Sequence, residues 1–203
     1  REITPAGSNV AGLDGGMNLL SERLVDDAER LGVKLVTRYD VIALDRDPRR
    51  PGWMVIQRQP MDGDKTAVAR GELLVMATDG PTAVRLMGSH MQDAQNYTPR
   101  PGPRIALATL VLDCPALDPA PRGTGLLVSE DVRDVSAKAL THASAKWKWV
   151  AREVGEHRHV LRLSYGRAAQ RGSGPSPEVA LEDKHLIALA LGDASTLLGV
   201  PIE

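Results

Sequence analysis

The first candidate for ligand chemistry is the glycine pair Gly15-Gly16, which directly precedes an amphipathic segment. A glycine-rich turn before a helix lets a phosphate approach the free N–H groups at the helix N-terminus. A turn that needs glycine dihedral angles explains the pair equally simply, and the pair alone favours this second interpretation. Neither GxGxxG nor GxxxxGK[ST] occurs in the sequence. The pyrophosphate loop for a bound dinucleotide is therefore expected to lie outside this chain.

Two histidines offer the second candidate. His157 and His159 are two residues apart, so they would share one face of a strand, and Glu153 or Glu156 could complete a metal site. Surface histidines beside a turn are the favoured interpretation, and we predict no metal. The single cysteine, Cys114, excludes an intramolecular disulfide and is expected to pack rather than react. GxSxG is absent, so the catalytic residues stay unassigned.

Basic and aromatic side chains gather in a third candidate region between residues 146 and 162. Such a group can bind carboxylates through charge-assisted hydrogen bonds, or stack single-stranded nucleic acid on its tryptophans. A solvated hairpin whose tryptophans cover a core edge is the favoured interpretation, with carboxylate binding second. The formal net charge of −1 gives no general attraction to nucleic acid, and we predict no such partner. The residues are Lys146, Trp147, Lys148, Trp149, Arg152, Arg158 and Arg162.

The elements that must position these groups begin with a helix and a strand. Apolar residues recur at three- and four-residue spacing from Leu20 to Leu31, which predicts a helix with one apolar face that includes Leu24. Gly32 suits the C-terminal cap. Residues 33–44 then alternate with β-branched enrichment, which predicts a strand. A helix joined to a strand by one glycine is an α/β unit.

Further along, strands are predicted at 53–57, 68–72 and 73–78, the last being an apolar run typical of a strand buried on both faces. A helix is expected over 82–87. The proline-rich run 99–103 predicts a crossing between two domains. Beyond it, closely spaced strands are expected, followed by a final helix that starts near residue 177. These later strands are predicted at 105–113, 125–129, 137–144 and 160–165.

Composition limits the class of protein. The chain has 203 residues, of which 42% are hydrophobic and only 3% aromatic, so aliphatic side chains must fill the core. No apolar run is long enough for a transmembrane helix, and the first residues lack the pattern of a signal peptide. With one cysteine, these features predict a cytoplasmic protein. The first residue is Arg1 rather than methionine, which suggests an excised piece of a longer protein.

Several blocks of the sequence share the order and spacing of motifs found together in one family. The blocks are DGGMNLL (14–20), VKLVTRYDVIAL (33–44), WMV (53–55), LVMATDGPTAVRLM (74–87), GTGLLV (123–128), ASAKW (143–147) and LRLSYGR (161–167). The family's patterns are GGMxxL, VxLxTxVxxL followed by GWxV, VVLATPAPAAARLL, GxGxLV, SSKW and LRxSxGR. In these blocks, which cover residues 10–200, the chain resembles the protoporphyrinogen/coproporphyrinogen oxidases of the flavin-containing amine oxidase superfamily.

The resemblance implies an α/β or α+β chain in two parts. Residues 1–88 would be the central part of a Rossmann-like FAD-binding domain, and residues 89–203 a substrate-binding domain built on a β-sheet with flanking helices. The cofactor would be FAD, with the backbone of Val41 at its adenine end. The cationic partner of the substrate propionates would lie upstream of Arg1. The residues implied at the substrate face are Thr124, Gly125, Leu127 and Ser164.

The implied activity is the oxidation of a porphyrinogen to a porphyrin in heme biosynthesis, with molecular oxygen as acceptor. The resemblance leaves open whether the substrate is protoporphyrinogen or coproporphyrinogen, whether the protein associates peripherally with a membrane, and whether it forms a homo-oligomer. It also implies an internal fragment without the GxGxxG segment and without the C-terminal FAD segment, inactive by itself. The alternatives are another amine oxidase or desaturase of this superfamily, and a stand-alone binding module that uses the basic region.

Overall fold

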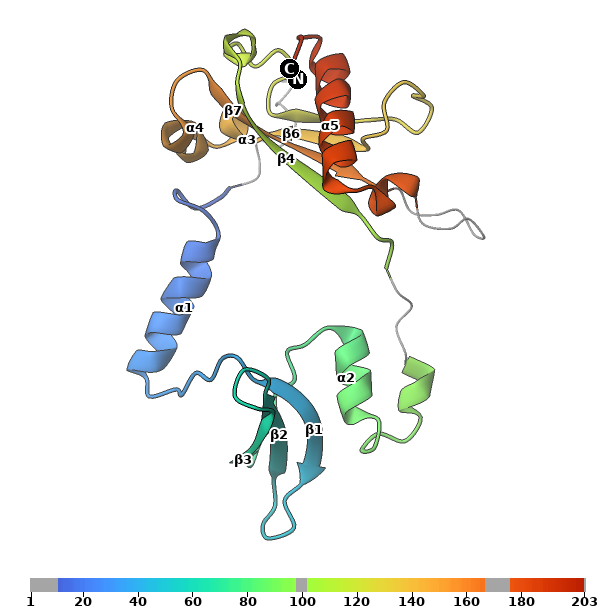
Figure 1. Ribbon diagram of the computed structural model, residues 1–203. Helices are drawn as coiled ribbons and strands as arrows, with labels where there is room; N and C mark the ends of the chain where they lie inside the picture. Colours follow the sequence, from blue (N-terminus) through green and yellow to red (C-terminus); the bar gives the residue numbers. More distant parts are fainter. Residues whose placement is uncertain (1–10, 98–101, 167–175, 203) are drawn as a thin grey trace, which may run out of the picture. The chain divides into compact units, whose positions relative to one another are not determined.

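The computed structural model describes residues 11–97, 102–166 and 176–202, and the protein has an α+β fold with antiparallel sheets (Figure 1). The chain divides into two compact units. The larger unit contains residues 1–24 and 102–203, and the smaller unit contains residues 25–101. This division follows contacts within the chain, and the FAD-binding and substrate-binding roles of residues 1–88 and 89–203 stay predictions. The predicted domain crossing at 99–103 lies largely outside the described residues.

The smaller unit is a three-stranded meander with one helix. The strands β1 (Asp40–Arg46), β2 (Trp53–Gln59) and β3 (Lys65–Gly71) pair antiparallel in the order β1-β2-β3. Helix α2 (Gly80–Met87) begins at Asp79, whose carboxylate accepts a hydrogen bond from the Thr82 N–H at 3.0 Å. The short helix η1 (Ala94–Tyr97) follows. Leu86 of α2 and Leu44 of β1 are the buried apolar side chains here.

Three predictions for the N-terminal half need correction. Helix α1 (Asn18–Arg30) forms as predicted, but it buries none of its residues, and Leu24 is 61% exposed. The strand predicted at 33–44 begins only at Asp40, and 73–78 forms no strand, with Leu73 90% exposed. A strand needs a neighbour for its backbone hydrogen bonds, and the described residues provide none for these segments. Leu24→Ala should therefore be nearly neutral in this chain.

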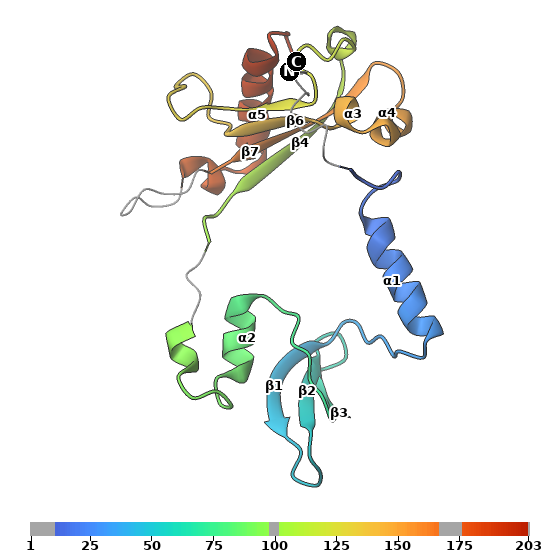
Figure 2. The same ribbon diagram turned by 180° about the vertical axis from the view of Figure 1, so that it is seen from behind.

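The larger unit contains a four-stranded antiparallel sheet. Its strands are β4 (Ala106–Asp113), β5 (Gly125–Leu127), β6 (Ala139–His142) and β7 (Arg158–Tyr165), in the order β4-β7-β6-β5. Helix α5 (Asp183–Leu198) lies across one face of this sheet (Figures 1 and 2). The short helices are η2 (Pro115–Leu117), α3 (Ala143–Lys146), α4 (Lys148–Val154) and η3 (Pro177–Ala180).

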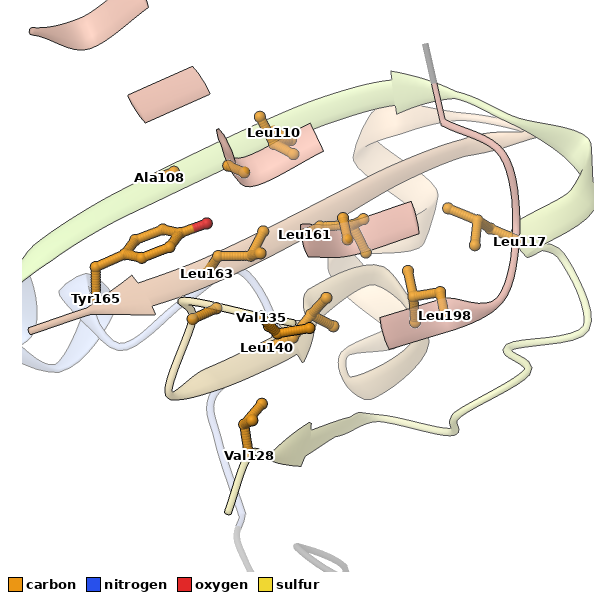
Figure 3. Close-up of a cluster of buried hydrophobic side chains, with 13 residues drawn as sticks. Ala108, Leu110, Leu117, Val128, Val135, Leu140, Leu161, Leu163, Tyr165 and Leu198 are labelled. Atoms are coloured by element: carbon orange, nitrogen blue, oxygen red, sulfur yellow. The ribbon is translucent and has the colours of Figure 1, made fainter. Parts of the chain in front are cut away.

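Strand alternation explains the core. In β7, Leu161, Leu163 and Tyr165 are fully buried, and the residues between them are more exposed. Figure 3 shows these side chains in one cluster with Leu110 of β4 and Leu198 of α5. The four later strands are thus confirmed, although β5 and β6 are shorter than predicted. The hairpin favoured for the basic region is wrong at 146–149, because Lys146 ends α3, Lys148 and Trp149 begin α4, and Trp147 lies between these two helices.

Among the described residues, no helix combines the length and the apolar character that crossing a bilayer requires.

Candidate functional site

The face of the larger sheet opposite α5 brings together most of the residues predicted at the substrate face. Two rows of directly paired residues cross all four strands on this open face. The first row is Leu107, Ser164, Ala139 and Leu127, and the second is Thr109, Arg162, Thr141 and Gly125. Their neighbours along the strands point into the core, so strand alternation fixes which side these residues occupy.

In the first row of this open face, the side chains at the two edges are large and apolar, and the side chains between them are small. Leu127 is 87% exposed, and Leu107 and Val111 of β4 are also exposed. Between them, Ser164 and Ala139 occupy the two central strands and are half-buried. Small side chains between larger apolar ones leave a shallow surface that a flat apolar ring can contact with little loss of side-chain freedom.

Gly125 has a structural role between β5 and β6 that the sequence analysis did not predict. The resemblance implies this glycine at the substrate face. Its φ of +137° is one that L side chains rarely adopt, and a Cβ on it would lie 2.3 Å from the Leu140 carbonyl oxygen of β6. The glycine thus permits close approach of β5 to β6. Thr124, which precedes it, accepts a backbone hydrogen bond from the His142 N–H at 3.0 Å.

Arg162 stands at the centre of the open face without a counter-charge. It is exposed, and the residues directly opposite it on the two neighbouring strands are Thr109 and Thr141. Arg158, four residues earlier on the same face, lies opposite Asp113. No hydrogen bond or ion pair of the Arg162 side chain is found within the described parts of the chain. Its guanidinium is therefore available to a ligand.

Val41 borders a separate hollow in the smaller unit, of about 470 Å³. The strand β1 is an edge strand, and its pairing with β2 shifts register between Val41 and Ala43. A bulge on an edge strand leaves backbone groups without a ladder partner. Arg58 and Arg85 also border the hollow. The contact of the Val41 backbone with FAD stays a prediction.

A second hollow, of about 370 Å³, lies in the larger unit and is lined by a hydrogen-bonded chain of histidines. The sequence analysis identified only two of these histidines. His157 Nδ1 and His159 Nε2 both lie within hydrogen-bond distance of the Asp118 carboxylate, at 2.7 and 3.1 Å. His159 Nδ1 is 3.0 Å from His142 Nε2. Asp118 and His142 are distant in sequence from this histidine pair, so no local pattern could reveal them.

The predicted description of two surface histidines is half right. His157 is exposed and precedes β7 with a φ of +59°, so it does not share a strand face with His159, which is buried. The described residues contain no group of three or more histidine, cysteine or acidic side chains arranged to hold a metal ion.

For neutral rings, the hydrogen bonds of His159 and His142 select one tautomer of each histidine. The Asp118 carboxylate only accepts, so His159 donates through Nε2 and its neutral Nδ1 accepts from His142 Nε2. His142 Nδ1 then remains a buried acceptor without a hydrogen-bond partner. Burial, followed by the proximity of His159, lowers the pKa of His142 from 6.5 to about 4. Hydrogen bonding to Asp118 raises the pKa of His157.

We expect His142 to make the fold acid-sensitive. Its pKa is lower in the folded than in the unfolded state, so its contribution is fully present above about pH 6.5 and is lost as pH falls toward about 4. The loss is about 2–3 kcal/mol at pH 4.5. His157, whose pKa is raised, has the opposite effect: its contribution is present below pH 6.5 and is lost as pH rises through its folded pKa.

Urea unfolding at pH 7.5 and pH 4.5 measures this effect. His142→Gln keeps a donor for His159 and should lose less stability between the two pH values than the wild type. His185→Gln, on the exposed side of α5, should match the wild type. Equal pH dependence of the wild type and His142→Gln would contradict the assignment.

Comparison of the sequence with protein-family models and with curated proteins finds no match to either.

Proposed function

We propose that this chain is part of an FAD-dependent porphyrinogen oxidase and that the open face of the larger sheet contacts the tetrapyrrole. The observation that carries the proposal is the register of the sheet. Gly125 and Leu127 of β5 and Ser164 of β7, which the family resemblance implies at the substrate face, occupy one open surface although the two strands are far apart in the sequence. The convergence of these two strands on one surface supports a common role.

The chemistry of the surface suits the ring system of a tetrapyrrole. Leu107, Val111 and Leu127 offer exposed apolar contact, and Ala139 and Ser164 leave space above the central strands. The substrate would be oriented by these contacts. FAD, when bound, would supply the redox chemistry by accepting a hydride, and the protein supplies orientation and exclusion of water.

The fit of the cofactor to this chain is partial. The hollow beside Val41 has an edge strand and Arg85, which suit a planar group that carries negative charge, whereas Arg58 at the same hollow forms an ion pair with Asp40 at 3.2 Å. A dinucleotide pyrophosphate usually requires a glycine-rich loop before a helix, and GxGxxG is absent from this sequence. One backbone hydrogen bond contributes roughly 0.5–1.5 kcal/mol, whereas micromolar affinity needs about 8 kcal/mol. We therefore expect this chain alone to bind FAD weakly and to be inactive.

Porphyrin binding by the 203-residue chain tests the proposal directly. Coproporphyrin III, a fluorescent product analogue, should bind saturably. Leu127→Asp should weaken binding by about 10-fold or more, because contact with one leucine side chain contributes about 1.5–3 kcal/mol. Leu127 is so exposed that the fold should tolerate this change.

Leu73→Asp is the matched control, since Leu73 is equally exposed but lies in the smaller unit. It should leave the affinity for coproporphyrin unchanged. Absence of saturable binding to the wild type, or equal losses in both variants, would refute the proposed substrate face. Saturable quenching of flavin fluorescence at micromolar FAD would show that the cofactor site is more complete than we propose.

A further inference from the structure

An unpaired arginine in the middle of a sheet face points to an anionic ligand. Arg162 lies on β7, one of the two central strands, with a threonine directly opposite it on each side. Two other arginines of this unit have partners: Arg122 donates to the Leu197 carbonyl oxygen at 3.2 Å, and Arg152 forms an ion pair with Asp14. Arg162 alone combines a central position on the open face with a free guanidinium among the described residues of the unit.

The neighbours of Arg162 favour a carboxylate over a larger polyanion. The guanidinium presents a planar fork of N–H donors that matches the two oxygens of a carboxylate. Directly opposed residues in an antiparallel sheet have Cβ atoms about 4.5–5.5 Å apart, so the hydroxyl groups of Thr109 and Thr141 lie within reach of a group held over Arg162. A single cation between two neutral hydroxyl groups suits one carboxylate rather than the phosphates of a nucleic acid, which need several cations.

The apolar row lies beside this polar row. Ser164 and Arg162 are two residues apart on β7, which separates the two rows by about 7 Å along the strand. A ring that contacts Leu107, Ser164 and Leu127 would therefore have Arg162 at its margin. A short carboxylated side arm on the ring can span this interval.

We propose that Arg162, flanked by Thr109 and Thr141, binds a carboxylate side arm of the tetrapyrrole that lies on the open face. The inference rests on the proposed function and deepens it: a cation within this chain binds one carboxylate side arm, in addition to the cationic partner that the resemblance implies upstream of Arg1. The role of Arg162 is to position and select the ring through its side arm. The residues of the basic region between 146 and 162 therefore lie in different elements. Arg162 is on β7, Trp149 is in α4, and Trp147 lies between α3 and α4.

The test compares two porphyrin probes and two arginine variants of the full 203-residue chain. The probes are coproporphyrin III, with four propionates, and its tetramethyl ester, both titrated by fluorescence in the same mild detergent. Arg162→Gln should weaken coproporphyrin binding by 10-fold or more and leave the affinity for the ester unchanged. Arg158→Gln, on the same strand and face but opposite Asp113, should change neither affinity more than about 2-fold. Arg162→Lys should recover part of the loss.

Each outcome separates the two proposals. If wild-type protein binds both probes and Arg162→Gln binds coproporphyrin as tightly as the wild type, Arg162 does not hold the carboxylate, but the substrate face stands. If Arg162→Gln and Arg158→Gln lose affinity for coproporphyrin equally, the effect is general surface charge and the inference fails. If the wild type binds neither probe, the proposed function fails and the inference with it. Thermal melts of both variants should equal the wild type, since both side chains are exposed.

Discussion

Asp193→Ala is expected to lower the free energy of unfolding of the larger unit by about 3 kcal/mol. Asp193 lies on α5, is only 5% exposed, and accepts hydrogen bonds from the Ala137 N–H at 2.8 Å and the Ser136 N–H at 3.4 Å. A hydrogen bond to a charged group contributes about 1.5–3 kcal/mol, and a buried N–H left without an acceptor costs about 1–3 kcal/mol. The carboxylate thus fastens the helix to the segment that leads into β6.

Thermal or urea unfolding followed by circular dichroism measures the effect of Asp193→Ala, which should lower Tm by roughly 10–20 °C. Asp193→Asn keeps one acceptor oxygen and should fall between the wild type and the alanine variant. Asp134→Ala is the control, because it removes an exposed carboxylate close to Ser136 in the sequence. It should change the free energy of unfolding by less than about 0.5 kcal/mol. A loss in Asp193→Ala no larger than in Asp134→Ala would show that the buried carboxylate does not stabilise the fold.

Gly125→Ala should destabilise the larger unit by about 2–4 kcal/mol and detach β5 from the sheet. A Cβ at this position would lie 2.3 Å from the Leu140 carbonyl oxygen and 2.9 Å from the Thr141 Cα, both in the backbone of β6. Strain at such a φ costs about 1–3 kcal/mol, and overpacking against a backbone that cannot easily move adds about 1–3 kcal/mol.

Gly123→Ala separates the two causes. Gly123 also has a positive φ, of +61°, but a Cβ on it would meet nothing within 4 Å. It should cost only about 1–2 kcal/mol, the price of the left-handed conformation. The two variants are compared by urea unfolding and by hydrogen exchange of the Val128 N–H, which directly follows β5 and donates to the Lys138 carbonyl oxygen at 2.9 Å. Equal losses in both would mean that conformation alone explains the requirement for glycine at 125.

Helices and strands were predicted correctly where the periodicity of apolar residues matches the backbone geometry of the element. Helix α1, the strands β2, β4 and β7, and the final helix follow from periodicity, which reflects the backbone geometry of each element. The failures at 33–39 and 73–78 have a shared origin. Their apolar composition is suited to burial, but burial depends on which segments pack against them, and Leu73 and Val75 remain exposed among the described residues.

The candidate site was accessible to sequence reasoning only in part. Leu127 and Ser164 were indicated by resemblance, but their convergence depends on β6 and β7 pairing across the sheet. Arg162 was grouped with Trp147 and Trp149 because they are close in sequence; strand register instead places it between two threonines. No sequence pattern near Asp118 or His142 indicates that they belong to the same site. They are 142 − 118 = 24 positions apart and are connected through the hydrogen bonds that each makes with His159.

The order of strands in the larger sheet also has a consequence for folding kinetics. Its longest ladder joins the edge strand β4 to β7, and even the closest paired residues, Asp113 and Arg158, are 158 − 113 = 45 positions apart. In the smaller unit, Arg46 pairs with Trp53, only 53 − 46 = 7 positions away. Non-local pairing slows folding because a long loop must close before its contacts form. The meander of β1, β2 and β3 should therefore form early. The open face needs β4, β7, β6 and β5 together and should be completed late. The recovery of porphyrin binding during refolding should then report the slow closure of the β4–β7 ladder.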